Sequence, residues 1–163
     1  MHLREFFESL YLHQVKYLVC GGVAINLYGI PRATADLDII LDFDENNLKK
    51  FLECVKEFGY QQGLPVSILE MADEEKRTRL IQEKNLIALS FFSSTFQMVT
   101  LDVLVDVPFD FSKLWANKTE RNSGKTPLYL VSPEDLARLK QYSNREQDRL
   151  DIESLKKLFP EKF

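Results

Sequence analysis

Three aspartates and two glycines give this sequence its chemical character. Asp36 and Asp38 are two residues apart in the apolar stretch DLDIILDF, so both side chains leave the same side of a β-strand. Aspartate is disfavoured in strands, and a buried charge needs a partner such as a metal ion. Carboxylates placed in this way suit a hard cation such as Mg²⁺. Metal-assisted chemistry is therefore expected here, and solvated aspartates on an edge strand are the weaker alternative.

The two glycines follow a short apolar run and precede a helical pattern. Gly21 and Gly22 would open a turn whose backbone N–H groups, at the start of a helix, suit a phosphate group. Taken alone, they are better explained by a tight strand-to-helix turn without a ligand. The sequence has neither GxGxxG nor GK[ST] at this point, so neither a dinucleotide-binding turn nor a P-loop is supported.

A third carboxylate lies in the later apolar stretch TLDVLVD. Asp102 would stand beside Asp36 and Asp38 if the two strands are neighbours in the sheet. Asp106 lies on the same strand face and could take its place, although it is closer to the strand end. Asp42 fits a solvated strand end or a helix cap better. Three acids on two central strands, next to a glycine turn, favour a metal site over isolated surface aspartates.

Helices and strands alternate early in the chain, and strands pair later. Helical patterns are predicted over residues 3–12, 23–28, 44–58, 108–115, 133–142 and 144–158, and strands over 15–20, 35–43, 86–92 and 97–105, with a hairpin over 118–130. The last helix is expected to face inward with Leu150, Ile152, Leu155 and Leu158. Within the less regular residues 60–85, a short strand over 65–69 and a charged turn or helix over 72–79 are expected. The pattern indicates an α/β (α+β) fold with a mixed central sheet, helices mainly on one face and C-terminal helices.

Length and composition restrict the class of protein further. The 163 residues suit a single domain over 1–163, with a core of about 14–131 and a helical segment of about 132–159. A net charge of −4 argues against a chain-wide electrostatic grip on nucleic acid. Cys20 and Cys54 match no metal-ligand spacing and are expected as buried thiols. With no signal-peptide pattern and no membrane-length apolar run, a cytoplasmic protein without a membrane partner is expected.

The segment GGVAINLYGIPRATADLDI, followed by TLDVLV, resembles the DNA polymerase β-type nucleotidyltransferase superfamily. The likeness is closer to its small stand-alone bacterial members, the AbiEii-like and MNT-like nucleotidyltransferases. The segment SPEDLARLKQYSNREQDRLDIESL resembles the closing part of that family, in which a lysine, an R-x-x-D and a further aspartate recur on two helices. The likeness runs from about Lys16 to Leu158, but no motif matches between Tyr60 and Asn85. It implies the nucleotidyltransferase fold.

The resemblance also implies roles for the residues already described. Gly21 and Gly22 would face the triphosphate, Asp36 and Asp38 would hold magnesium, and Asp102 would complete the metal site and assist deprotonation of the acceptor hydroxyl. Two magnesium ions are expected, which activate the attacking oxygen and stabilise the leaving pyrophosphate. Many members carry serine where this chain has Gly22, so only backbone donors remain there.

Four further residues are candidates for the site. The resemblance implies that Lys140 would contact a nucleotide phosphate and that Asp148 would be a positioning residue. Arg32 and Thr34 precede Asp36 and Asp38 in the sequence. For Arg32, a contact with a phosphate or the acceptor and a solvated loop position are expected about equally. The alternative for Lys140 is a lysine on an exposed helix face, and the alternative for Asp148 is a helical salt bridge with Arg145. For these residues the structural explanation is favoured.

The expected function is that of a magnesium-dependent nucleotidyltransferase of the EC 2.7.7 type, which moves a nucleoside monophosphate from an NTP such as ATP to a hydroxyl acceptor. The acceptor is left open between RNA such as tRNA, a protein and a small molecule. An RNA acceptor would fit the toxin of a toxin–antitoxin pair, with a cognate antitoxin as partner. The alternative is a catalytically inactive nucleotide-binding or partner-binding module on the same fold.

Overall fold

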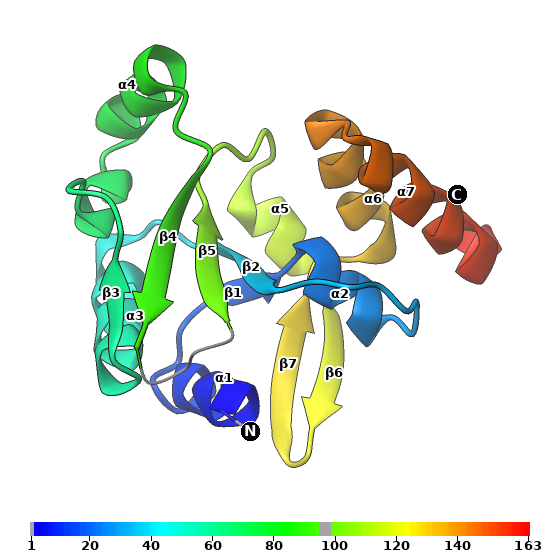
Figure 1. Ribbon diagram of the computed structural model, residues 1–163, viewed down its shortest axis with the longest axis horizontal. Coiled ribbons are helices and arrows are strands. Elements are labelled where there is room, and N and C mark those ends of the chain that lie inside the picture. The colour runs from blue at the N-terminus through cyan, green and yellow to red at the C-terminus, as the bar shows by residue number, and fades with distance from the viewer. Residues whose placement is uncertain (1, 95–98) are drawn as a thin grey trace.

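A computed structural model describes residues 2–94 and 99–163 (Figure 1). Within these residues, seven strands form one mixed sheet in the order β3-β4-β5-β2-β1-β7-β6. The strands are β1 (Tyr17–Val19), β2 (Asp36–Leu41), β3 (Tyr60–Gln62), β4 (Ala88–Ser93), β5 (Thr100–Leu104), β6 (Thr119–Ser123) and β7 (Thr126–Leu130). The predicted mixed α/β architecture is confirmed, with β2 and β5 next to each other near the middle of the sheet.

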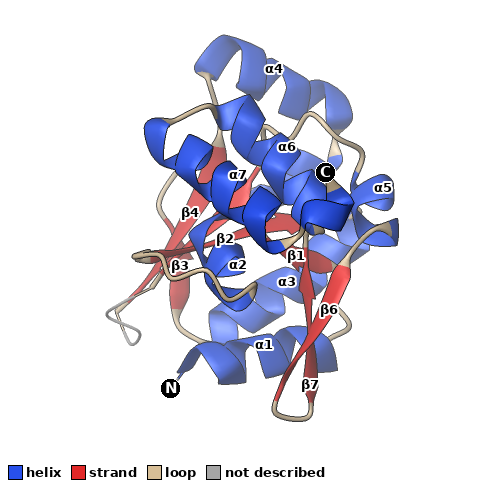
Figure 2. Cartoon of the chain, turned by 90° about the vertical axis from the view of Figure 1, so that its right-hand side faces the viewer, coloured by secondary structure: helices blue, strands red, loops and turns tan. Residues whose placement is uncertain are grey.

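The helices flank this sheet. They are α1 (His2–Leu12), α2 (Gly21–Leu27), α3 (Glu45–Glu57), α4 (Glu74–Lys84), α5 (Phe111–Ala116), α6 (Pro133–Ser143) and α7 (Glu146–Leu158), with short 3₁₀ helices at Ile68–Ala72 and Pro160–Lys162. In Figure 2, α1 and α3 lie below β2, and α6 and α7 lie above it. None of the helices in the described part of the chain combines the length and apolarity needed to cross a membrane.

Strands β2 and β5 run parallel and align the residues that matter for function. Leu37 pairs with Leu101 and Ile39 with Val103, and these four side chains are fully buried. Since side chains alternate along a strand, the opposite face of the same two strands carries the aspartates. Asp38 is the register partner of Asp102. The expectation that the two carboxylate-bearing strands are neighbours is therefore confirmed.

The C-terminal helices form a hairpin whose inner face differs from the prediction. Asn144, expected to start the last helix, instead ends α6 in the left-handed conformation with φ of +51°. Leu150 and Leu158, expected to face inward, are 53% and 46% exposed, whereas Leu155 is buried as expected. The inner face of α7 carries Asp148 and Asp151 in place of the two leucines. These carboxylates can be buried because basic side chains from α6 and the α2–β2 loop neutralise them.

Two local predictions need correction, and one lies partly outside the described residues. Residues 65–69 form no strand: Ser67 caps the 3₁₀ helix Ile68–Ala72, with Glu70 completing a capping box. Helix α2 begins at Gly21, two residues before the predicted start, so both glycines belong to its first turn. The strand predicted over 97–105 is observed from Thr100, and its first positions lie outside the described residues. Cys20 and Cys54 are buried free thiols, as expected.

Candidate active site

Two aspartates from adjacent parallel strands form the floor of a cleft of about 650 Å³. We call Asp38 of β2 and Asp102 of β5 the carboxylate floor. One oxygen of Asp102 accepts a hydrogen bond of 2.6 Å from the hydroxyl of Ser90, its register partner on β4. The central strands thus set both backbone positions, and Ser90 fixes the orientation of one carboxylate.

The floor carries negative charge that its surroundings do not neutralise. Burial, followed by the neighbouring charges of Asp102 and then Asp36, raises the pKa of Asp38 to about 6. Arg145 and Lys140 act against this rise without cancelling it. A cation or a proton at the floor would therefore relieve electrostatic repulsion.

The third predicted metal ligand is placed differently from the other two. Asp36 is exposed at the first position of β2, in register with Thr100, and is not among the described residues that line the cleft. In the described part of the chain, no three His, Cys, Asp or Glu side chains are grouped so that they could hold a metal ion. The hard oxygen donors of the carboxylate floor fit Mg²⁺, which commonly takes one or two protein carboxylates together with substrate phosphates.

The glycine turn packs directly on the floor. Gly21 has φ of +62°, and a Cβ there would collide with the carboxylate of Asp38, whose Cγ would lie 2.7 Å away. Both the backbone conformation and the contact therefore require glycine. A Cβ on Gly22 would meet the guanidinium of Arg32 and lie 2.7 Å from Oγ1 of Thr34. The place that a serine side chain would need is thus already filled by Arg32.

Above the floor, a buried lysine joins the two C-terminal helices. Lys140 of α6 is 4% exposed, and its Nζ donates hydrogen bonds of 2.6 Å to Asp151 and 3.2 Å to Asp148 of α7. The Nε of Arg32 lies 3.1 Å from the same Asp151 carboxylate, as an ion pair without hydrogen-bond geometry. The alternative of a lysine on an exposed helix face is therefore wrong. Lys140 lines the cleft, and its contact with a nucleotide phosphate stays a prediction.

Asp148 is bound more tightly than any other carboxylate described here. Its side chain accepts hydrogen bonds from Ser143 Oγ (2.7 Å), from Arg145 Nε (3.0 Å) and from the Arg145 backbone N–H (3.1 Å). Burial acts to raise the pKa of Asp148, but these hydrogen bonds and Lys140 outweigh it and lower the pKa to about 2. The predicted Arg145–Asp148 pair is confirmed. The Arg145 side chain is nevertheless largely exposed and lines the cleft.

Five side chains alternate in charge across this region, and we call them the charged wall: Arg32, Lys140, Arg145, Asp148 and Asp151. The α2–β2 loop that supplies Arg32 is held by two 2.8 Å hydrogen bonds between its backbone and the side chain of Asn26. Thr34 donates a 3.3 Å hydrogen bond to the backbone oxygen of Asp36. These contacts give Arg32 and Thr34 structural partners, so neither is simply a solvated loop residue.

The structure separates the predicted site residues into two groups. Described residues that line the cleft include Gly21, Asp38, Asp102, Lys140 and Asp148, whereas Asp36, Gly22, Arg32 and Thr34 lie outside its lining. Sequence reasoning missed Asp151, Ser90 and the exposure of Arg145. The three-residue spacing of Asp148 and Asp151 places them on one helix face and was an available signal.

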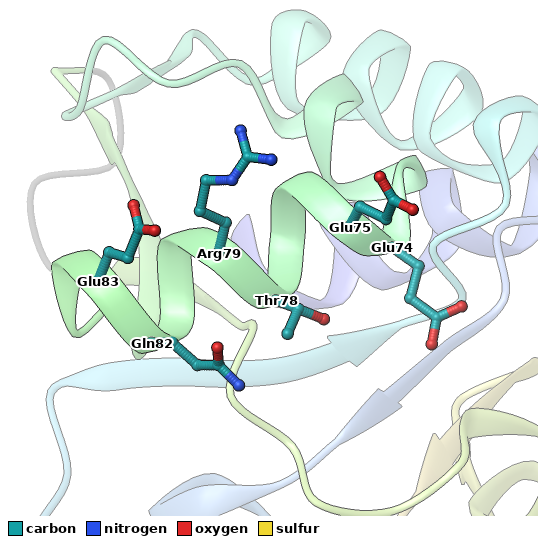
Figure 3. A pocket seen from close by; sticks show the side chains of 6 residues that line it. All are labelled: Glu74, Glu75, Thr78, Arg79, Gln82 and Glu83. Atoms are coloured by element: carbon teal, nitrogen blue, oxygen red, sulfur yellow. The ribbon is translucent and has the colours of Figure 1, made fainter.

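A second hollow runs along α4, far from this chemistry in the sequence (Figure 3). Its lining consists of Glu74, Glu75, Thr78, Arg79, Gln82 and Glu83, all from one helix. In Figure 3 these side chains project from two sides of the helix and do not converge. The hollow is therefore a charged helix surface, with no arrangement comparable to the carboxylate floor.

Comparisons with known proteins give a family and two solved structures of similar fold. A family model described as "Nucleotidyltransferase of unknown function (DUF6036)" matches residues 1–158. Among solved structures, the lincomycin-bound lincosamide antibiotic adenylyltransferase LnuA is similar, with a TM-score of 0.62 and 17% identity over 96% of each chain. An antigenic nucleotidyltransferase-like protein from Paracoccidioides brasiliensis gives a TM-score of 0.60 and 18% identity over 97% of this chain and 73% of its own. Curated protein sequences give no significant match.

Proposed function

Since this chain belongs to the family of nucleotidyltransferases of unknown function DUF6036, we propose that it transfers a nucleoside monophosphate from an NTP to a hydroxyl acceptor at the carboxylate floor. One observation carries the proposal. Asp38 and Asp102 lie side by side on parallel strands in a cleft that Lys140 and Arg145 also line. This places acidic groups for a cation and basic groups for phosphates around one space.

The reaction is an in-line displacement at the α-phosphorus. The acceptor oxygen forms a bond to phosphorus, the bond to pyrophosphate breaks, and the hydroxyl proton passes to a carboxylate oxygen of Asp102. Ser90 occupies one oxygen of Asp102, which leaves the other free to accept that proton. Magnesium held by Asp38 and Asp102 would polarise the phosphoryl group and acidify the hydroxyl.

The charged wall has the complementary role. Arg145 is the exposed cation of the cleft and would contact the phosphates as they enter. Lys140 is held by two carboxylates and would add positive potential from inside the wall. The close contact between Gly21 and the Asp38 carboxylate holds the start of α2 against the floor, where its backbone N–H groups would face the triphosphate. Charge neutralisation of the leaving pyrophosphate is the contribution expected from these groups.

The test is a label-transfer assay with each α-labelled NTP and Mg²⁺, offered to separate pools of tRNA and other RNA, protein and small hydroxyl compounds. Wild type should label one pool, and the Asp36→Ala plus Asp38→Ala double variant should not. Glu153→Gln is a matched control because Glu153 is exposed on α7 and is not among the described residues that line the cleft. A labelled tRNA pool would support the toxin role, which growth arrest relieved by an adjacent antitoxin would then test.

The alternative predicts a different outcome of the same experiment. A catalytically inactive module on this fold would bind an NTP and leave every pool unlabelled. Wild type that neither binds any NTP nor labels any pool would contradict the enzyme and the nucleotide-binding module, and would favour a partner-binding module.

A further inference from the structure

The cleft has two chemically different ends, and the second has no role in the proposed transfer. Near Gly21 and the carboxylate floor its lining is polar and charged. Away from the floor the lining is mostly apolar and comes from Ile87, Ala88, Leu104, Leu139 and Tyr142, with Asp106 among them. The inference below rests on the proposed function, because it concerns the same substrate.

Two large side chains at the apolar end are exposed to an unusual degree. Ile87 is 66% exposed and Tyr142 is 53% exposed, although both line the same hollow. Ile87 immediately precedes β4 of the sheet, and Tyr142 lies in the last turn of α6. Exposed apolar side chains gathered around a concave site mark a place where a ligand covers them.

A polar group is built into this apolar end. The hydroxyl of Tyr142 lies 3.1 Å from each carboxylate oxygen of Asp106 and donates to that carboxylate. The backbone N–H groups of Val105 and Asp106 both donate to the carbonyl of Ile87, at 2.8 and 3.1 Å. Asp106 is therefore fixed by the sheet on one side and bridged to α6 on the other, with spare lone pairs on its carboxylate.

The spacing along β5 relates the two ends. Asp102 and Leu104 lie on one face of β5, Asp106 follows two residues after the strand ends, and all three line the cleft. A strand rise of about 3.3 Å per residue means that the backbones of Asp102 and Asp106 are at most roughly 13 Å apart. The carboxylate floor and the apolar end together match one kind of molecule. It joins an anionic group, which a cation at the floor would hold, to a flat, largely apolar ring with an amino group. An NTP has that order of groups in a single molecule.

We propose that the apolar end binds the nucleobase of the NTP. Tyr142 and Ile87 cover the faces of the base, and the carboxylate of Asp106 accepts a hydrogen bond from its exocyclic amino group. Adenine, cytosine and guanine carry such a group and uracil does not, so ATP, CTP and GTP are bound in preference to UTP. The carboxylate repels the uracil carbonyl at the same position, which strengthens the discrimination.

The test compares the dissociation constants of ATP, UTP and inorganic triphosphate, measured by calorimetry with Mg²⁺ on the full chain. Tyr142→Ala should weaken ATP binding about tenfold to a hundredfold, as expected for loss of stacking on a base, and leave inorganic triphosphate unchanged. Tyr142→Phe keeps the ring and should keep most of the ATP affinity. Asp106→Asn should reduce the preference for ATP over UTP about tenfold, because an amide can donate to the uracil carbonyl.

The results that overturn the inference differ from those that overturn the proposed function. If Tyr142→Ala weakens ATP and inorganic triphosphate equally, or weakens neither, the base does not lie at the apolar end. If wild type binds ATP and UTP equally, Asp106 does not contact an amino group. If wild type binds neither an NTP nor inorganic triphosphate, the proposed function fails and this inference fails with it. Selective ATP binding without transfer to any pool would overturn only the enzymatic activity.

Discussion

The carboxylate floor and the charged wall contain the same chemical group in opposite electrostatic situations. On the floor, Asp38 is crowded by burial and by two other carboxylates, so its pKa rises to about 6. In the wall, Asp148 is buried and Asp38 on the floor is only half-buried, yet hydrogen bonds from Ser143 and Arg145 lower the pKa of Asp148 to about 2. The neighbours that the surrounding strands and helices supply make the difference.

This difference separates charges that hold the fold together from charges that await a ligand. The wall alternates positive and negative groups, and each of its two carboxylates pairs with two cations, so each carboxylate stabilises the folded chain. The floor keeps repulsion that folding does not relieve, and such retained strain is typical of functional sites. Replacing aspartate by asparagine should therefore have opposite effects on stability in the two regions.

The largest effect is expected for the floor. Asp38→Asn or Asp102→Asn should lower nucleotidyl transfer about a thousandfold, since the charge at the reaction centre contributes several kcal/mol to transition-state stabilisation. The free energy of unfolding should stay the same or increase. Rates from the label-transfer assay and urea unfolding of the same preparations check both statements. A variant that keeps wild-type rates would remove the floor from the mechanism.

The wall should respond in stability first. Asp151→Asn leaves Lys140 and Arg32 without their shared partner, and breaking a buried ion pair from one side costs about 3–5 kcal/mol. Urea unfolding should show this loss, and Glu153→Gln on the exposed side of α7 should show almost none. If both variants unfold like wild type, the charged wall is not the element that joins the C-terminal helices to the α2–β2 loop.

The pH dependence of stability provides a finer comparison. Because the pKa of Asp38 is higher in the folded than in the unfolded chain, the folded state binds the extra proton, and stability falls as pH rises from about 4 to about 6. Asp38→Asn lacks this loss and should exceed wild type by about 1–3 kcal/mol at pH 8, with no difference near pH 4. The pH dependence due to Asp148 has the opposite sign. Its contribution to the free energy of unfolding is present above about pH 4 and is lost as pH falls towards 2.

The smallest predicted effect concerns the support of the floor. Ser90→Ala removes the 2.6 Å hydrogen bond to Asp102 and should lower the transfer rate about tenfold, equivalent to about 1.4 kcal/mol. Ser90→Thr keeps a hydroxyl on a strand and should restore most of the rate. Equal losses in both variants would indicate that packing on β4, and not the hydrogen bond, matters at this position.

The parts of the site that lie on strands could be predicted from the sequence. Alternation of apolar and acidic residues is a local property, so it predicts that Asp38 and Asp102 each lie opposite the apolar face of their own strand, without knowledge of the fold. The glycines were placed at a strand-to-helix turn for a similar reason. The specific need for Gly21, which is its contact with Asp38, depends on two segments meeting and could not be derived locally.

The charged wall could not be predicted in the same way. The inward face of α7 was assigned from its leucines, whereas Asp148 and Asp151 occupy it and Leu150 is exposed. A buried carboxylate is stable only when a cation arrives from another element, here Lys140 from α6. Such pairings are long-range, and hydrophobic periodicity contains no information about them.

The crowding of Arg32 over Gly22 couples three positions of the chain. A side chain at position 22 would press against the guanidinium of Arg32, so it would have to push that group aside. The Nε of Arg32 pairs with Asp151, and a displaced Arg32 would leave Lys140 as the nearby cation of that carboxylate. A substitution at position 22 is therefore expected to act on the contact between α7 and the α2–β2 loop.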